Sequence, residues 1–193
     1  RLSGTNRVGN KAYTSMLKFH TPGGLAAVWA PENTREAIFD ALARRETYAT
    51  SGPRMAVRFY AGWSIDEAVA NDHNAVQSLM ANGVPMGGVL RPDVAEHTSP
   101  GFFVWATRDA IDAPLQRVQM VKGWIDDDGQ THEKVVDIAC SNGLTVDPIS
   151  DRCADNGASV DVTTCNFSTN SGADELKTVW HDPEYDPTHA AFY

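Results

Sequence analysis

The chain has 193 residues, of which 42% are hydrophobic and 21% are charged, and its mean hydropathy is -0.33. These values exclude an intrinsically disordered, collagen-like or coiled-coil protein and suit one ordinary domain or two small ones. The 25 acidic and 16 basic residues leave a net charge of -9 with no basic cluster, which disfavours nucleic-acid binding. The longest uncharged apolar stretch, residues 22–31, falls short of the roughly 20 residues that cross a bilayer, so we expect no membrane span.

The two ends of the sequence indicate a piece of a longer protein. The first residue is Arg1 rather than Met, and the last four residues, 190–193, form an apolar run that is typical of a strand. Residues 1–20 are polar and without a sustained period, and we predict a loop there.

Residues 25–50 predict a strand, a helix and a strand. The apolar run 25–30 follows two glycines and ends at Pro31, which is typical of a buried strand. Asn33 and Glu36 form a capping box for a helix over 34–45. The expected buried face of this helix carries Ile38, Ala41, Leu42 and Arg45. A β-prone stretch, 47–50, closes what we interpret as an α/β unit.

The pattern changes after Pro53. Alternation over 55–60 predicts a strand with one face in a core and one in solvent, and a capping box at 64–67 begins a helical patch that ends near Gly83. Three further strands, 102–106, 118–121 and 135–138, predict antiparallel pairing, with Asp128-Gly129 as a type I′ hairpin turn between the last two. A β-sandwich is the fold that we expect to hold these strands.

The three cysteines leave two alternatives open. Cys153 and Cys165 bracket a turn-rich segment with few apolar residues, where a disulfide would stabilise the fold by roughly 3 kcal/mol. The alternative is three reduced, partly buried thiols. We favour the Cys153–Cys165 disulfide, which leaves Cys140 free or paired outside this chain.

Candidate metal ligands are scattered. The six histidines are His20, His73, His97, His132, His181 and His189. None lies within five residues of another, so we interpret them as surface or structural residues. Asp126 to Gly129 resembles part of a calcium loop, but Trp124 stands where an acidic ligand is needed, and a hairpin turn is favoured. For the acidic loop Asp151, Asp155, Asn156 and Asp161, a calcium site and ordinary Asx-turns both stay open, with turns favoured.

Other catalytic signatures are missing from the sequence. It contains neither a Gly-x-Ser-x-Gly elbow nor a GxGxxG motif, and no His is close to a Cys that could act as a nucleophile. The five tryptophans could bind sugars if they shared one sheet face, but we expect Trp105 and Trp124 to pack in the core instead. The residues alone therefore indicate a scaffold without its own chemistry.

A long run of the sequence resembles a known family. The run is GLAAVWAPENTREAIFDAL at 24–42, continued by RRETYATSGPR at 44–54. Shorter matching runs are Gly83–Gly88, Val121–Trp124, His132–Val135, Arg152–Cys153, Asp155–Ala158, Asp182–Pro183 and Phe192–Tyr193. Together they are similar to a bacterial family of unknown function that is related to the polymerase-and-histidinol-phosphatase (PHP) metallohydrolases, in the branch of carbaryl hydrolase. Pro31 departs from that pattern, which has an acidic residue there.

The resemblance implies a fold class and a domain division. It implies an α+β chain in which residues 1–52 are the C-terminal end of a distorted (β/α) barrel, closed by the strand, helix and strand of 25–50. Residues 53–193 would be an antiparallel β-sandwich with a helical insertion near 64–82. The metal-ligand motifs of the family lie upstream of this segment, so the chain itself would hold no metal and no catalytic residue.

The resemblance also implies an activity for the parent protein. That activity is hydrolysis of a phosphoester or related ester by water activated on divalent Zn, Mn or Fe. Tyr48, Ser51 and Arg54 would lie nearest the substrate, although simple pairing of Arg54 with an acidic neighbour is the favoured alternative. The expected partners are the upstream barrel and a small-molecule substrate, and a disulfide would indicate a periplasmic or secreted location. The alternative function is a non-catalytic β-sandwich that binds a glycan or a protein.

Overall fold

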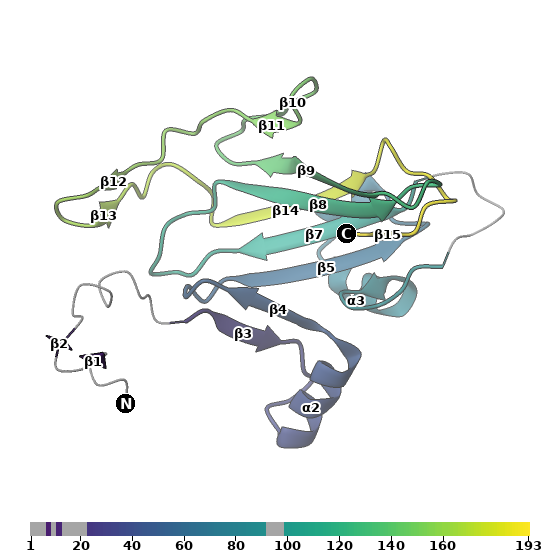
Figure 1. Ribbon diagram of the computed structural model, residues 1–193, viewed down its shortest axis with the longest axis horizontal. Helices are drawn as coiled ribbons and strands as arrows, with labels where there is room; N and C mark the ends of the chain where they lie inside the picture. Colours follow the sequence, from purple (N-terminus) through teal and green to yellow (C-terminus); the bar gives the residue numbers. More distant parts are fainter. Residues whose placement is uncertain (1–6, 9–10, 13–22, 92–98) are drawn as a thin grey trace.

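The structure, a computed structural model, describes residues 7–8, 11–12, 23–91 and 99–193. Its elements form separate antiparallel sheets with little helix (Figure 1). In chain order the elements are β1 (Arg7–Val8), β2 (Lys11–Ala12), β3 (Leu25–Val28), α2 (Arg35–Arg44), β4 (Thr47–Thr50), β5 (Ala56–Gly62), the 3-10 helix η1 (Glu67–Asn71), α3 (Ala75–Asn82), β6 (Val84–Pro85), β7 (Gly101–Thr107), β8 (Arg117–Ile125), β9 (Thr131–Cys140), β10 (Val146–Asp147), β11 (Arg152–Cys153), β12 (Val160–Asp161), β13 (Asn166–Phe167), β14 (Glu175–His181) and β15 (Ala191–Phe192). The predicted loop over 1–20 contains the short pair β1–β2, and its other residues lie outside the described ones.

The predicted strand, helix and strand are all present, but the two strands are antiparallel. β3 pairs with β4 from Leu25 opposite Thr50 to Val28 opposite Thr47. Neighbouring strands of a (β/α) barrel are parallel, so this pair does not form the α/β unit that the sequence suggested. The order of elements follows local patterns, whereas the pairing direction depends on how the chain returns after the helix.

The N-cap of helix α2 lies one residue later than predicted. Thr34, rather than Asn33, is the N-cap, and its hydroxyl accepts a hydrogen bond from the Ala37 amide at 3.3 Å. The buried positions are Ala37 and Ala41, while the predicted core residue Leu42 is 52% exposed. The buried face is therefore narrow and made of small side chains.

The four-stranded sheet has the order β14-β7-β5-β6, and apolar residues cover both of its faces. On one face Tyr60 and Phe103 pack with Leu79 of α3. On the other face Phe59 packs with Phe102, the neighbouring residue of Phe103 on β7. The prediction of a solvent-facing side for β5 was wrong, because the helical segment covers that side.

That helical segment has two parts instead of one patch. Asp66 caps η1 through the Ala68 amide at 3.0 Å, so the predicted capping box at 64–67 is not formed by Ser64. In α3, Ala75 and Leu79 are buried but Met80 is 68% exposed. The residues near 64–82 therefore include two short helices, η1 and α3.

The three-stranded sheet has the order β15-β8-β9. The β8–β9 hairpin confirms the predicted antiparallel pair, and the Asp126 carboxylate accepts hydrogen bonds from the amides of Asp128 and Gln130 in its turn. Only Gly129 has a positive φ there, 76°, whereas a type I′ turn needs two such residues. The connection is thus longer than a two-residue turn, and its glycine lies in the left-handed region.

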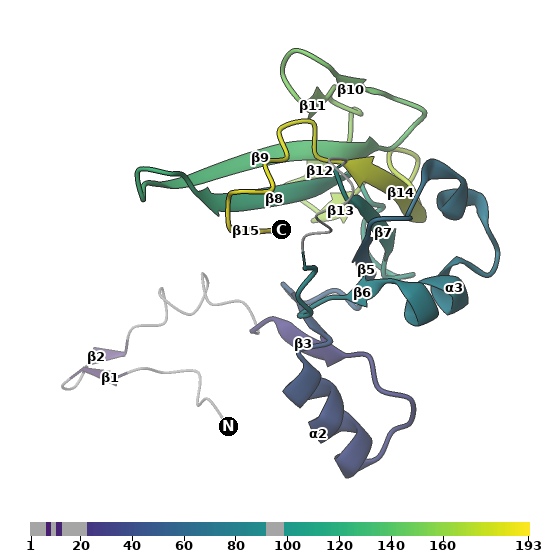
Figure 2. The ribbon, with the colours of Figure 1, turned by 90° about the vertical axis from the view of Figure 1, so that its right-hand side faces the viewer.

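The two larger sheets contribute to one core. Phe102 and Val104 of β7 pack with Met120 of β8 and with Val136 and Ile138 of β9. The four-stranded sheet therefore lies between the helical segment and the β8–β9 hairpin, as Figure 2 shows.

The unit of β3, α2 and β4 lies at the far end from β9 in Figure 2. Trp29 attaches it to β5: the indole N–H donates to the Val57 carbonyl at 2.8 Å, and the Arg58 guanidinium lies 3.4 Å from the ring centroid. Gly87, with a φ of 77°, leaves room for Arg45 at the end of α2, because a Cβ at this position would overlap that residue. No helix in the described part of the chain is both long and apolar enough to cross a membrane.

The segment between β9 and β14 is irregular and contains a disulfide, but not the predicted one. Cys140, at the end of β9, is bonded to Cys153 on β11, with a Cα–Cα distance of 5.6 Å. Cys165 is free and exposed, in the turn between β12 and β13. The Cys153–Cys165 prediction was wrong because β11 packs beside β9, a contact that the sequence spacing does not reveal.

Candidate functional site

The three residues proposed to approach a substrate have different surroundings. Tyr48 is half-buried beside Trp29, with ring centroids 6.0 Å apart, and Ser51 is exposed after β4. Arg54 is exposed, and its backbone N–H donates to the Asp109 carboxylate at 2.7 Å, which is the largest cause of the lowered pKa of Asp109. None of the three lines the cavity described below.

The histidines do not converge on a metal site. His73, His132 and His181 are exposed, His189 is half-buried, and His20 and His97 lie outside the described residues. Within the described ranges, no three His, Cys, Asp or Glu side chains are placed to hold a metal ion.

The acidic loop forms the Asx-turns that the sequence favoured. The carboxylate of Asp155 accepts from the Gly157 amide at 3.0 Å, and that of Asp161 accepts from the Thr163 amide at 2.8 Å. Asn156 likewise accepts from the Ala158 amide at 3.0 Å. Asp151 has a different role, because it pairs with Lys134 across the cavity described next.

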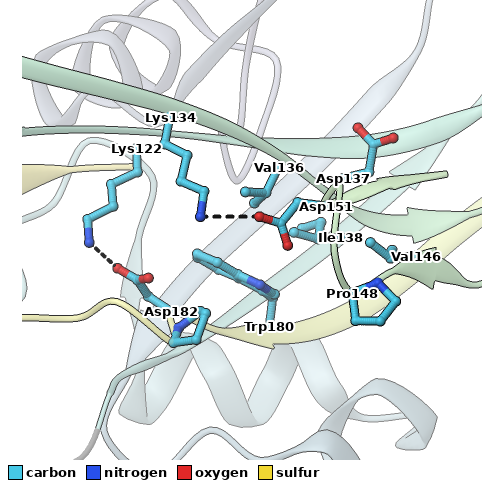
Figure 3. A pocket seen from close by; sticks show the side chains of 11 residues that line it. Lys122, Lys134, Val136, Asp137, Ile138, Val146, Pro148, Asp151, Trp180 and Asp182 are labelled. Atoms are coloured by element: carbon cyan, nitrogen blue, oxygen red, sulfur yellow. Dashed lines mark hydrogen bonds and ion pairs between the residues drawn. The ribbon is translucent and has the colours of Figure 1, made fainter.

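A cavity of about 280 Å³ opens where β8, β9 and β14 meet the β10–β11 segment. Trp180 of β14 lies across it, and Figure 3 shows the side chains of Lys122 and Lys134 reaching toward it from the strands above. Its apolar lining is Val136, Ile138, Val146, Pro148, Trp180 and Pro183, and its charged lining is Lys122, Lys134, Asp137, Asp151 and Asp182.

One end of the cavity is closed by a buried ion pair. The Lys122 ammonium donates to the Asp182 carboxylate and, at 2.8 Å, to the Glu184 carbonyl. Asp182 also accepts from the Tyr193 hydroxyl at 2.7 Å and the Glu184 amide at 2.9 Å. Burial and the bond to Asp182 raise the pKa of Tyr193 well above its usual range. Both oxygens of Asp182 therefore have protein partners.

The open rim carries a more accessible pair. Lys134 lies 3.2 Å from the Asp151 carboxylate and 2.8 Å from the Glu184 carboxylate, and its side chain is 33% exposed. The Asp151 side chain is 39% exposed. The hydrogen bond to Glu184 is the largest cause that raises the pKa of Lys134, so this lysine stays charged at neutral pH.

Asp137 is part of the cavity wall, but its carboxylate is buried within the protein. Its carboxylate has no exposed surface and accepts from the Cys153 amide and the Gln119 side-chain amide, both at 2.7 Å. Figure 3 shows it pointing away from Trp180. Burial would raise the pKa of Asp137, but these hydrogen bonds, with Arg117 and Arg152 nearby, leave it lowered.

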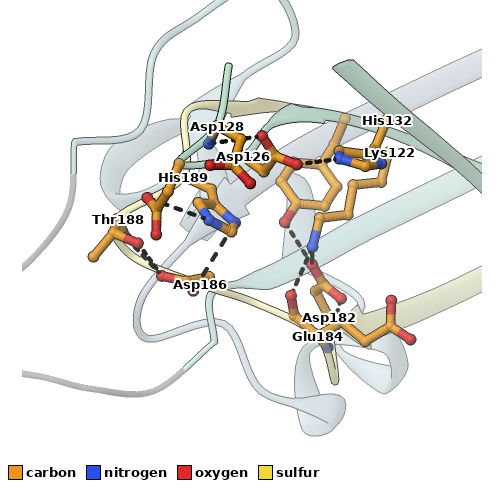
Figure 4. Close-up of polar contacts among 11 residues, drawn as sticks. Lys122, Asp126, Asp128, His132, Asp182, Glu184, Asp186, Thr188 and His189 are labelled. Atoms are coloured by element: carbon orange, nitrogen blue, oxygen red, sulfur yellow. Dashed lines mark hydrogen bonds and ion pairs between the residues drawn. The ribbon is translucent and has the colours of Figure 1, made fainter. Parts of the chain in front are cut away.

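A second polar network lies beside this one, at the tip of the β8–β9 hairpin (Figure 4). His132 stacks on Trp124 and lies 2.6 Å from the Asp126 carboxylate, which is the largest cause of the lowered pKa of Asp126. His189 lies 3.8 Å from Asp127 and 3.9 Å from Asp186. These contacts link the hairpin tip to the segment that follows β14.

The charged groups that line the cavity have partners within the protein. The carboxylates and ammonium groups of the cavity are already paired with each other, and its lining contains no serine, cysteine or histidine. An apolar floor with a few polar groups at the rim is typical of small-molecule sites.

Of the charged residues that line the cavity, sequence reasoning singled out only Asp151, as part of an acidic loop. Lys122, Lys134 and Asp182 do occur in the short runs that carry the family resemblance, 121–124, 132–135 and 182–183. Those runs are the signal that could have marked them, but they are far apart in sequence, and only the fold brings them together.

Comparisons with known proteins return one family. The family described as "Protein of unknown function (DUF3604)" matches residues 2–193. Neither the curated proteins nor the solved structures contain a significant match. The match covers nearly the whole chain, and the protein belongs to the DUF3604 family.

Proposed function

We propose that this chain is the C-terminal, non-catalytic part of a metal-dependent hydrolase of the PHP type, in the carbaryl hydrolase branch, which acts on phosphoesters or related esters. The observation that carries this proposal is the exposed apolar face of α2. Phe39 is 68% exposed and Leu42 is 52% exposed, while only Ala37 and Ala41 are buried. A strand–helix–strand unit with so little core of its own fits an element that packs against a further part of the same protein.

The proposed partner of this face is the upstream barrel, to which the region from residue 53 would be appended as a β-sandwich. Tyr48, Ser51 and Arg54 lie in and after β4, on the unit that would contact that barrel. Arg54 would there reach a substrate only through its side chain, since its backbone is bonded to Asp109.

The metal of such a hydrolase does not fit the described residues of this chain. They bring no three suitable ligands together, so the Zn, Mn or Fe that activates water needs ligands from elsewhere in the protein. The contribution of this chain is structural support of the barrel, and we derive no hydrolytic step from it. The Cys140–Cys153 disulfide supports a periplasmic or secreted location.

The experiment compares the product of the complete coding sequence with the 193-residue chain. Phe39→Glu should leave the melting temperature of the 193-residue chain unchanged, because the side chain is exposed there. In the complete product it should lower the melting temperature, the bound metal and the hydrolysis of bis(p-nitrophenyl) phosphate.

Met80→Glu is the matched control, since Met80 is also 68% exposed but lies on α3, outside this unit. It should have no effect in either protein. Equal behaviour of the two variants in the complete product would refute the docking face. Absence of bound metal from the wild-type complete product would refute the hydrolase.

A further inference from the structure

The cavity at Trp180 has no part in the proposed hydrolysis, and its construction indicates a ligand of its own. It is far in sequence from the β3–α2–β4 unit. It is lined by residues of β8, β9, β10 and β14, of the turn between β10 and β11, and of the segment after β14. We propose that this cavity binds a single neutral sugar ring.

The size of the cavity limits the ligand. The volume of about 280 Å³ lies just below the range of small-molecule pockets, which measure roughly 300 to 1,000 Å³. One six-membered ring with its hydroxyl groups fits this space, whereas an extended chain does not.

The paired charges of the cavity disfavour a charged ligand. Lys122, the more buried lysine, is 9% exposed and is satisfied by Asp182, itself 3% exposed. Asp137 has no exposed surface. The accessible charges are those of Lys134 and Asp151. An anion would have to displace Asp151 from Lys134, while a cation would have to displace Lys134 from Asp151. Separating such pairs is costly in a partly buried site, so an uncharged molecule is favoured.

The groups that stay accessible match a sugar. Trp180 offers an apolar ring surface on which the C–H face of a sugar can lie. The Trp180 ring also packs against Phe102, with ring centroids 5.8 Å apart. At the rim, Lys134 supplies a donor and Asp151 an acceptor, and both are about one-third exposed. A sugar hydroxyl donates and accepts at once, so it can bridge this pair without separating it.

The wall that closes the cavity is held by the disulfide. Val146, Pro148 and Asp151 lie between Cys140 and Cys153 in sequence, and the Cys153 amide is bonded to Asp137 on β9. This anchoring keeps the rim acceptor near Lys134 in the absence of a ligand, which lowers the entropic cost of binding.

The test is calorimetric titration of the chain with glucose, galactose, mannose and N-acetylglucosamine. At least one should bind saturably, and glucose 6-phosphate and inorganic phosphate should bind at least tenfold more weakly or not at all. No saturable binding of any of the four sugars overturns the proposal, and so does tighter binding of either phosphate compound.

Methyl glycosides of the sugar that binds distinguish its source. Loss of binding when the anomeric oxygen is methylated indicates a free monosaccharide, and retained binding indicates the terminal residue of a glycan. Both outcomes support a site for one neutral ring.

Variants locate the binding in this cavity. Val146→Phe should fill the space and abolish binding, whereas Val160→Phe, at an exposed strand position of β12, should not. Lys134→Met removes the rim donor but keeps the aliphatic stem, and it should weaken binding about tenfold. Lys177→Met, outside the cavity, is its control. Unchanged affinity in a folded Val146→Phe or Lys134→Met variant overturns the assignment. This outcome is independent of the metal and docking tests above.

Discussion

Asp137 shows how a charged residue is accommodated inside this fold. The β8–β9 register skips Ile138, because Val118 is opposite Ala139 and Gln119 is opposite Asp137. At this β-bulge Ile138 packs in the core with Val136, whereas Asp137 is buried beside β11. The carboxylate then joins β8, β9 and β11 through its hydrogen bonds.

Asp137→Ala should lower the free energy of unfolding by about 2–4 kcal/mol, because it leaves buried donors without an acceptor. Urea denaturation measures this change. Asp155→Ala is the control, since it removes one exposed turn bond and should cost about 0.5 kcal/mol. Equal losses for the two variants would contradict the role assigned to Asp137.

Lys122 and Asp182 allow a second test of buried charge. Lys122→Met leaves a buried carboxylate without its cation and should cost about 3–5 kcal/mol. Adding Asp182→Asn removes that charge and keeps an acceptor for the Tyr193 hydroxyl. The double variant should therefore unfold at a higher urea concentration than Lys122→Met alone. If it is the less stable of the two, the pair is not electrostatically coupled.

At the level of secondary structure, the position of the β10–β11 segment depends on a disulfide bond. Its strands have two residues each, and the disulfide joins Cys140 and Cys153 at a sequence separation of 13. Small elements of this kind bury too little apolar surface to stay ordered alone.

Reduction of this disulfide should destabilise the chain by about 3 kcal/mol in the chain-entropy model. Thermal unfolding with and without tris(2-carboxyethyl)phosphine measures the effect, and Cys140→Ser should reproduce it. Cys165→Ser should unfold like the unmodified protein, because Cys165 is free. A large effect of Cys165→Ser would show that the pairing is different.

The acidic character of the protein predicts how its overall stability depends on pH. Six aspartates have a lowered pKa in the folded state. They are Asp109, Asp126, Asp137, Asp147, Asp161 and Asp186. The unfolded chain then binds more protons than the folded one near pH 4, so these groups stabilise the fold above their unfolded pKa of about 3.9.

The melting temperature should therefore stay high from pH 7 to 5 and fall as the pH drops below about 4. Differential scanning calorimetry at pH 7, 5 and 3 measures this dependence. The Asp137→Asn variant should lose part of it, because one lowered pKa is then absent. A constant melting temperature between pH 7 and 3 would refute this linkage.

Local sequence patterns were sufficient for most elements of the structure. The strands within 102–106, 118–121 and 135–138, the helix after residue 34 and the turn at Asp126–Gly129 all follow from periodicity, caps and turn residues. Each of these signals depends on neighbours a few residues apart, which interact in the same way wherever the segment lies.

Contacts between distant segments set the remaining features. Three examples are the antiparallel direction of β3 and β4, the Cys140–Cys153 bond and the covering of β5 on both faces. Each depends on residues whose spacing along the chain follows no local pattern. The cavity at Trp180 is the clearest case, since Lys122, Lys134, Asp151 and Asp182 meet only after the sheets have formed. The sequence alone established a β-rich, acidic scaffold, while the long-range burial of apolar surface selected the pairings and thereby assembled the cavity at Trp180.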